Sequence, residues 1–356
     1  MLAEHPARRS QTSALREGPV RDSGIDGLKG LAIIAVVFIH GRFVFPAYIY
    51  ESAGYSSFDW CVPLFVILSA YGLSGSCDRA KAGSGWRWIS EKTKRSMLPF
   101  VVWSLVYFLW NWISHGHVEL IGLYRAFNGF AWPVQYYFIL LLQVIWLVAA
   151  LRGVTIAAGK IAAVVAVGAL VYIFWPVSAD QRELYLGLSF RLIVFWLPYV
   201  AVGVFASYRP LNGLSAPLSV AALVVAGSLL LMILESLVRR ELGLVGLGGY
   251  FRVSTLFAAI SLFAFGYRLL SSKSLRLVTA ALGTLGRHSL GIFCLNPLML
   301  AFLLRFYAWQ FESSAYAAGS NAFAVLAGIG LIASAILGCL LVSIGLRRIG
   351  AGRLVC

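Results

Sequence analysis

Charged side chains are scarce in this chain of 356 residues, and acidic ones are the scarcest, with 14 Asp and Glu against 29 Lys and Arg. Charged residues make up only 12% of the chain, whereas apolar residues make up 60%. This composition, with a mean hydropathy of +0.84, excludes an ordinary soluble domain. It is typical of a membrane protein that crosses the bilayer several times.

Metal-binding and nucleophile motifs are missing as well. The five cysteines lie in or beside apolar runs without metal-ligand spacing. His115 and His117 lie close together, but no third ligand follows at a suitable spacing, so we expect no metal site. The chain also lacks a dinucleotide-binding glycine motif, a Gly-x-Ser-x-Gly elbow and a visible internal repeat.

What the chain has instead is a series of apolar runs long enough to cross a bilayer, at about 20 residues each. We expect them to form one all-α integral membrane bundle of about ten transmembrane helices. The runs lie near residues 28–47, 60–76, 97–114, 132–151, 160–176, 190–207, 214–235, 250–270, 288–309 and 321–346. The connecting segments leave no room for a second soluble domain of ordinary size.

The distribution of basic residues predicts the orientation. Most of the 29 Lys and Arg fall in the segments that share a side with the N-terminus, so we expect both termini to be cytoplasmic. The net charge of +15 then reflects contact with anionic membrane lipid rather than nucleic acid. We expect a disordered cytoplasmic arm over 1–27, the ten-helix domain over 28–346 and a basic cytoplasmic tail over 347–356.

One histidine stands out because it lies inside the first apolar run. His40 follows Lys29 by eleven residues, which on an α-helix places the two within about 20° of one face and roughly 16 Å apart. A titratable group inside a span is a functional-site hypothesis, and a neutral imidazole suits a general base. A structural histidine bonded to a neighbouring span remains the alternative. Asp26 either pairs with Lys29 or serves the helix start.

Further basic residues precede the third and ninth runs. Lys92 and Arg95 are three residues apart on one face before Pro99, and Arg287 lies in the basic stretch 271–289. Such cations either grip a polyanion, such as a nucleotide diphosphate, or simply anchor the helices on the cytoplasmic side.

Polar residues also occur within the apolar runs. Ser69 among small residues favours close helix packing over a role as nucleophile, and Gln143 should face the bundle interior. We expect these two residues, with Asp26 and Asn296, to contact substrate or to pack between helices. Asn296 precedes Pro297, which frees a backbone carbonyl that needs another partner. The outer connections carry aromatic residues and carboxylates such as Asp59, a mixture that fits a sugar-like ligand or an ordinary aromatic belt.

Together these segments resemble the membrane acyltransferase 3 family, polytopic bacterial enzymes that transfer acyl groups to saccharides. The resemblance covers about residues 22–345. It is carried, in order, by GIDGLKGLAIIAVVFIH, VPLFVILSAYGL, KTKRSMLPF, WPVQYYFILLLQ and LGRHSLGIFCLNP. Three positions depart from the family pattern: Lys29 replaces an arginine, Ser69–Ala70 replaces Ser-Gly, and Asn296 replaces a frequent histidine.

The resemblance implies an O-acyltransferase of a bacterial inner membrane. Its donor would be acetyl-CoA or another acyl-CoA, used as a substrate and not as a permanently bound cofactor, with its phosphates held by Lys29, Lys92, Arg95 and Arg287. His40 would deprotonate a hydroxyl of a cell-surface polysaccharide or of its lipid-linked precursor. Because Asn296 cannot titrate, the role of base falls on His40.

Two alternatives to an enzyme remain at this stage. A transporter or flippase of a lipid-linked saccharide or small anion would use the same inner cations, but it should show two related halves, and no such symmetry is visible. A sensor or scaffold subunit of an export complex would tolerate replacement of Lys29, His40, Lys92 and Arg95.

Overall fold

The structure is a computed structural model. It describes residues 22–45, 55–80, 84–115, 132, 135–152, 157–174, 182–209, 211, 216–243, 248–311 and 321–355. The expected arm over 1–27 therefore lies outside the described residues, except for its last part.

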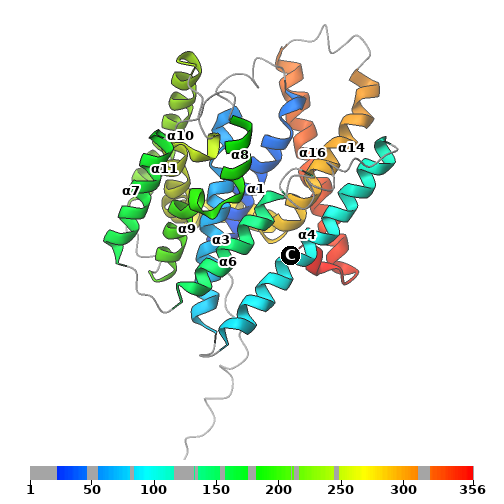
Figure 1. Cartoon of the computed structure of the whole chain (residues 1–356). Helices are drawn as coiled ribbons and strands as arrows, with labels where there is room; N and C mark the ends of the chain where they lie inside the picture. The colour runs from blue at the N-terminus through cyan, green and yellow to red at the C-terminus, as the bar shows by residue number, and fades with distance from the viewer. Residues whose placement is uncertain are drawn as a thin grey trace, which may run out of the picture.

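The described residues form helices and contain no strand. The helices are α1 (Ser23–His40), α3 (Cys61–Asp78), α4 (Gly85–His115), α6 (Tyr136–Ala150), α7 (Ala158–Phe174), α8 (Arg182–Arg191), α9 (Ile193–Ser207), α10 (Leu218–Glu241), α11 (Val253–Ser261), α12 (Tyr267–Leu270), α13 (Arg276–Arg287), α14 (Ser289–Phe311) and α16 (Asn321–Arg348). Figure 1 shows them side by side, with α7, α10 and α11 at one edge of the view and α4 and α14 at the other. The expectation of an all-α protein is confirmed.

Eight helical segments of the described chain are long and apolar enough to cross a membrane. They correspond to eight of the ten expected runs, and the other two runs form the shorter apolar helices α6 and α7. The protein is therefore a multi-pass membrane protein by length and composition of its helices. The full count of ten and the cytoplasmic location of the termini remain predictions.

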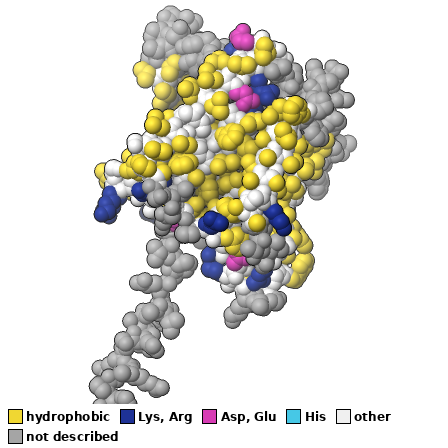
Figure 2. Space-filling view, turned by 90° about the vertical axis from the view of Figure 1, so that its left-hand side faces the viewer, with side chains coloured by type: hydrophobic (Ala, Val, Ile, Leu, Met, Phe, Trp, Pro, Cys, Tyr) yellow, Lys and Arg dark blue, Asp and Glu magenta, His cyan; other side chains and the backbone are white. Residues whose placement is uncertain are grey.

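The outer helices present apolar side chains to their surroundings. Leu223 of α10 is 71% exposed and Ile113 of α4 is 81% exposed. Figure 2 shows a broad apolar face on which most of the visible Lys and Arg lie toward one end. Such a surface is expected where the surrounding solvent is lipid.

Helix α1 forms the centre of the bundle and packs against α3, α13 and α14. Its contact with α13 depends on glycine. A side chain at Gly30 would place its Cβ 1.9 Å from the carbonyl oxygen of Leu282, and one at Gly286 would place it 1.9 Å from that of Asp26. Small residues allow the two backbones to touch. The basic stretch 271–289 is therefore largely a helix fixed on α1, and not only a connection.

The limits of the first helix differ from the expected run of 28–47. α1 begins at Ser23 because the Asp22 carboxylate accepts hydrogen bonds from the amides of Gly24 and Ile25, at 2.9 and 3.2 Å. It ends at His40, after which Gly41 packs against Ile332 so closely that a Cβ would lie 2.0 Å from that side chain. His40 thus lies at the end of the helix, and not within it.

Two other expected runs also differ in detail. The run 190–207 is divided between α8 and α9 at Leu192, and the run 97–114 is part of the longer α4, which already begins at Gly85. Apolar composition does not mark these limits, because the basic first turns of α4 continue the helix without a break.

Candidate functional site

The histidine singled out in the sequence is bonded to the asparagine singled out in the ninth run. His40 Nδ1 lies 2.6 Å from Asn296 Oδ1, and Asn296 is completely buried. The Asn296 amide nitrogen donates to the carbonyls of Ile292 and Phe293, at 3.0 and 2.8 Å. The Phe293 carbonyl needs this donor, because Pro297 lacks the N–H that would normally reach it. The amide orientation is therefore fixed.

This orientation also fixes the tautomer of the histidine. Asn296 uses its nitrogen for backbone carbonyls and offers its oxygen to His40, so a neutral His40 must donate from Nδ1. Nε2 then carries the lone pair and is the atom that can accept a proton. Asn296, expected as a substrate or packing residue, instead positions the imidazole.

A cavity of about 320 Å³, called the narrow cavity below, approaches this pair, although neither His40 nor Asn296 lines it. It is lined by α1, α3, α4, α6 and the start of α14. Lys29 and Lys92 supply its cations, Ser69 and Tyr137 supply hydroxyls, and Phe293 contributes an apolar wall. Asn296 follows Phe293 by three residues, about 4.5 Å along the helix, so the cavity reaches to within about one turn of the His40 contact.

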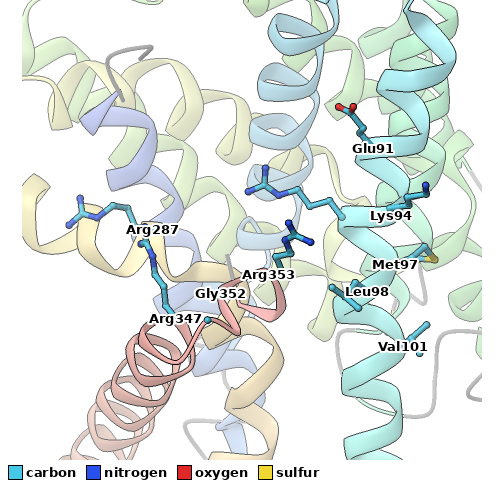
Figure 3. A pocket seen from close by; sticks show the side chains of 11 residues that line it. Glu91, Lys94, Met97, Leu98, Val101, Arg287, Arg347, Gly352 and Arg353 are labelled. Carbon is cyan, nitrogen blue, oxygen red and sulfur yellow. The ribbon is translucent and has the colours of Figure 1, made fainter. Parts of the chain in front are cut away.

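A larger cavity of about 1180 Å³ lies between α4, α13 and the C-terminal end of the chain. Figure 3 shows the arginines of α13, α16 and the C-terminal turn on one side and the α4 residues on the other. Its cationic lining consists of Lys94, Arg95, Arg287, Arg347 and Arg353, with Glu91 as the one acidic residue in it. Met97, Leu98 and Val101 form an apolar wall. Cations beside an apolar wall suit a phosphate ester that carries an organic group.

The four expected donor-binding cations are therefore divided between two cavities. Lys29 and Lys92 line the narrow cavity, whereas Arg95 and Arg287 line the larger one. The cavities are neighbours in the chain, because α4 contributes to both and Arg287 is followed two residues later by Ser289 in the narrow cavity. We call this part of the molecule the basic end of the bundle.

The C-terminal tail forms part of the basic end. Gly350 has a φ of +85°, which turns the chain back beneath the bundle. Trp103 Nε1 donates to the Leu354 carbonyl at 3.0 Å, and the Gly291 amide donates to the Val355 carbonyl at 3.1 Å. Val355 is fully buried. The basic tail expected over 347–356 is thus docked as far as Val355, and Arg353 reaches the larger cavity.

The remaining expected site residues have structural surroundings. Gln143 donates to the Arg191 carbonyl at 2.5 Å and accepts from the Ile193 amide at 3.1 Å. It therefore provides hydrogen-bond partners for backbone groups at the break between α8 and α9. Asp26 is buried in the first turn of α1, where its backbone carbonyl meets Gly286. Gln143 is therefore a packing residue, and Asp26 lies at the contact of α1 with α13.

Sequence reasoning missed Tyr137 and the tail arginines Arg347 and Arg353. Ser69 was expected to pack or to contact substrate, with packing favoured, and its Oγ lies 2.8 Å from the hydroxyl of Tyr137, with both residues in the lining of the narrow cavity. The polar phenols in WPVQYYF were a signal for Tyr137, and Gly350 followed by Gly352 was a signal that the tail turns back. Neither signal says which cavity the side chains reach.

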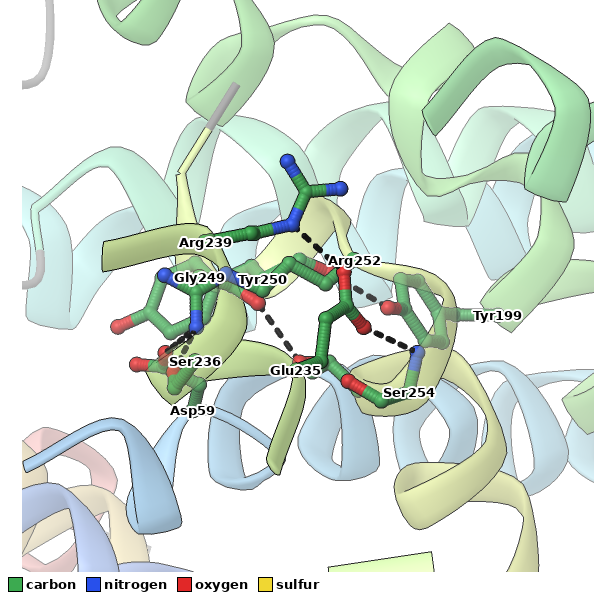
Figure 4. A network of polar contacts seen from close by, with 10 residues as sticks. Asp59, Tyr199, Glu235, Ser236, Arg239, Gly249, Tyr250, Arg252 and Ser254 are labelled. Atoms are coloured by element: carbon green, nitrogen blue, oxygen red, sulfur yellow. Dashed lines mark hydrogen bonds and ion pairs between the residues drawn. The ribbon is translucent and has the colours of Figure 1, made fainter. Parts of the chain in front are cut away.

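A second polar cluster lies at the opposite end of the bundle from the cavities. Figure 4 shows its residues, which come from α10, from the chain just before α3 and from the start of α11. Glu235 binds Arg239 Nε at 2.7 Å and the Ser254 amide at 3.1 Å. Asp59 Oδ2 lies 3.9 Å from Arg252, which also bonds Ser236. Burial raises the pKa of Asp59 to about 7, although the charge of Arg252 opposes this shift.

Contacts between aromatic rings relate this cluster to the histidine. Phe38 of α1 stacks on Phe58 with ring centroids 5.0 Å apart, and Asp59 follows Phe58 directly. Because Lys29 lies eleven residues before His40 on one uninterrupted helix, α1 runs from the basic end toward this opposite end. His40 therefore lies between the cavities and the second cluster.

Comparison with known proteins identifies the family of the chain through a family model alone. A family model for an acyltransferase domain, the acyltransferase 3 family, matches residues 22–346. No curated protein and no solved structure matches the chain. The match spans nearly the whole chain, from the cap of α1 to the last turns of α16, and includes the histidine, the asparagine and most residues of both cavities. The chain therefore belongs to the acyltransferase 3 family and is a membrane acyltransferase.

Proposed function

We propose that the protein is an O-acyltransferase that transfers an acetyl group from acetyl-CoA to a hydroxyl of a cell-surface polysaccharide or of its lipid-linked precursor. The observation that carries the proposal is the His40–Asn296 contact on the helix whose Phe293, one turn earlier, lines a cavity with cations in its lining. The basic end would face the cytoplasm of a bacterium, where acyl-CoA is made, and the protein would lie in the inner membrane.

The two cavities fit the two parts of such a donor. A nucleotide with several phosphates needs a wide, cationic space, which the larger cavity offers with Arg95 and Arg287 in its lining. A pantetheine arm needs a narrow, mainly apolar space, which the smaller cavity offers beyond Lys29 and Lys92. The thioester would then lie near Phe293, about one turn from Asn296.

The proposed chemistry requires one base and no resident cofactor. His40 Nε2 takes the proton of the acceptor hydroxyl while the acceptor oxygen attacks the thioester carbonyl carbon. The carbon–sulfur bond breaks, an ester bond forms, and the coenzyme A thiolate leaves with the proton that His40 held. The saccharide approaches from the side of the second polar cluster, because the cavities on the other side hold the donor.

The test compares donor binding with transfer in the purified protein, held in lipid nanodiscs. Acetyl-CoA should raise the thermal unfolding temperature of the wild type and of His40→Ala alike, because binding to the native state alone stabilises it. The wild type should transfer radiolabelled acetyl groups to octyl glucoside or to a lipid-linked oligosaccharide. His40→Ala should lose about 10²–10⁴-fold in rate.

Two results would overturn the proposal. One is the absence of any stabilisation by acetyl-CoA, which is the result expected of a saccharide transporter. The other is transfer by His40→Ala at the wild-type rate. His40→Gln serves as a second variant, because glutamine can still donate to Asn296 and preserves the helix end without offering a base.

A further inference from the structure

Two hydroxyl groups face each other in the wall of the narrow cavity. Ser69 Oγ of α3 and the Tyr137 hydroxyl of α6 lie 2.8 Å apart, and both side chains line the cavity. The Tyr137 hydroxyl also lies 3.3 Å from the Phe65 carbonyl. The pair joins two helices far apart in the sequence, which places it on firm structural elements rather than on a loop.

One of the two hydroxyl protons of this pair has only a weak acceptor. Two hydroxyls carry two protons, and the bond between them uses one. The second proton is directed at the Phe65 carbonyl over a long 3.3 Å contact, and that carbonyl lies within α3, where it also accepts the regular helical bond from the Ser69 amide. A ligand oxygen in the cavity therefore competes easily for this proton.

The Ser76 hydroxyl is less suitable than the Ser69–Tyr137 pair. Ser76 also lines it, but its Oγ donates to the Leu73 carbonyl at 2.9 Å and accepts from Trp88 Nε1 at 3.2 Å. These two partners occupy it and hold it near the start of α4. Ser69 and Tyr137 are instead surrounded by apolar cavity residues, among them Phe65 and Phe293, and a hydrogen bond in an apolar setting is stronger than in water.

The pair is linked to the histidine through Phe293 and Asn296. The ring of Tyr137 packs edge-on against Phe293, with centroids 5.3 Å apart. The carbonyl of Phe293 accepts from Asn296, and Asn296 accepts from His40. Phe293 thus contacts the hydroxyl pair through its ring and the His40–Asn296 unit through its backbone, so a thioester beside that ring would touch the pair through its oxygen.

From this geometry we infer that Tyr137, supported by Ser69, is a catalytic residue that donates a hydrogen bond to the thioester carbonyl oxygen. This inference rests on the proposed function. When the acceptor oxygen attacks the carbonyl carbon, the negative charge moves onto the carbonyl oxygen, and the hydroxyl pair stabilises it. When the charge returns to form the ester, the carbon–sulfur bond breaks, and the pair keeps both of its protons.

The test removes the hydroxyl and keeps the ring. Tyr137→Phe retains the contact with Phe293 but has no donor, and removing one such donor typically costs about 10²–10³-fold in kcat. The KM for acetyl-CoA should change by less than about threefold, because the bond strengthens mainly in the transition state. Ser69→Ala should lower kcat less, and Ser69→Thr, which keeps a hydroxyl, should restore much of it.

Tyr172→Phe is the matched control. Tyr172 is also a buried tyrosine whose hydroxyl donates to a backbone carbonyl, that of Phe195, but it does not line the cavity. Its variant should keep the wild-type kcat. Thermal unfolding with and without acetyl-CoA shows whether each variant is folded and still binds the donor.

The possible results separate this inference from the proposed function. If the wild type transfers acetyl groups and Tyr137→Phe has an unchanged kcat, or a raised KM alone, the catalytic role of Tyr137 is wrong and the proposed function stands. A loss in Tyr172→Phe equal to that in Tyr137→Phe would also overturn it, because the effect would then be one of packing. If the wild type binds no acetyl-CoA and transfers nothing, the proposed function itself is wrong, and this role is lost with it.

Discussion

The two ends of the bundle use charged residues in opposite ways. At the basic end, five cations and a single carboxylate line one large cavity, so positive charge is in excess around it. At the other end, Asp59 lies 3.9 Å from Arg252 and Glu235 binds Arg239 and the Ser254 amide, so each acidic group has a basic partner. An excess of one charge beside a cavity indicates a binding site, whereas acidic and basic groups that bind one another indicate a structural joint.

This comparison separates the residues that should affect the reaction from those that should affect stability. Histidine 40 lies between the two ends, and its partner Asn296 belongs to the helix that leads away from the basic end. If the comparison is correct, variants at the basic end and at His40 change kinetic constants. Variants in the second cluster should change the response to pH instead.

The largest effect in this comparison is expected from Asn296. Asn296→Ala removes the acceptor that holds His40 Nδ1 and leaves the Phe293 carbonyl without its donor beside Pro297. We expect kcat to fall by about 10–100-fold because the imidazole loses its orientation, as with other groups that orient a reactive side chain. Acetyl transfer under saturating acetyl-CoA measures this change.

Asn296→Gln is the companion variant, since it keeps an amide but displaces it by one methylene. A kcat for Asn296→Ala within twofold of the wild type would show that His40 needs no orienting partner. It would also remove the reason for treating the two residues as one unit.

The second largest effect is expected from the docked C-terminal tail. Its arginines line a cavity, unlike basic residues that only anchor helices at the membrane surface. Arg347→Gln with Arg353→Gln removes two of the five cations that line the larger cavity. A hydrogen bond to a charged group is worth about 1.5–3 kcal/mol, so the KM for acetyl-CoA should rise at least about tenfold while kcat changes little. Initial rates over a range of acetyl-CoA concentrations provide the measurement.

Arg348→Gln is the control for the tail variant, because Arg348 is exposed on the same turn of α16 but does not line the cavity. Its KM should stay at the wild-type value. An equal rise in both variants would mean that net positive charge, and not the cavity, attracts the donor. Added salt should then abolish the difference from the wild type.

The sequence predicted the elements better than the contacts between them. Apolar runs mark the helices because a membrane-spanning helix must be apolar throughout, and this pattern is local. His40 and Asn296 were each singled out as polar groups in apolar surroundings, but their 2.6 Å contact joins residues 256 positions apart. No local pattern encodes such a distance, so the orienting role of Asn296 became visible only in the fold.

The same reason explains what was missed at the basic end. Arg95 and Arg287 were expected to act together, and they line one cavity, but Lys29 and Lys92 line another. The division runs through α4, because Lys92 lines one cavity and Arg95, three residues later, lines the other. Helix periodicity places these two residues on one face but does not show where one cavity ends and the next begins. Tyr137 was missed for a related reason, because the local sequence does not distinguish a tyrosine that lines a cavity from the aromatic residues around it.

The smallest effect is expected from the second cluster, where the comparison predicts a dependence on pH without a change in donor binding. Burial raises the pKa of Asp59 from 3.8 to about 7, so the folded state holds its proton more tightly than the unfolded chain does. Unfolding then releases a proton between about pH 4 and 7, so the free energy of unfolding should fall as the pH rises through this range. Below about pH 4 Asp59 is protonated in both states, and its full contribution to the free energy of unfolding is present.

Asp59→Asn should lack this part of the pH dependence, because an amide does not titrate. Thermal unfolding temperatures of the variant and the wild type should differ least near pH 4, where Asp59 is protonated and resembles asparagine. The wild type should lose stability relative to the variant as the pH rises to 8. The KM for acetyl-CoA at fixed pH should stay unchanged. The carboxylate of Glu235 remains in both proteins with its bonds to Arg239 and Ser254, so the difference between the two curves reports on Asp59. A raised KM in Asp59→Asn would break the comparison, because a residue of the structural joint would then belong to the donor site.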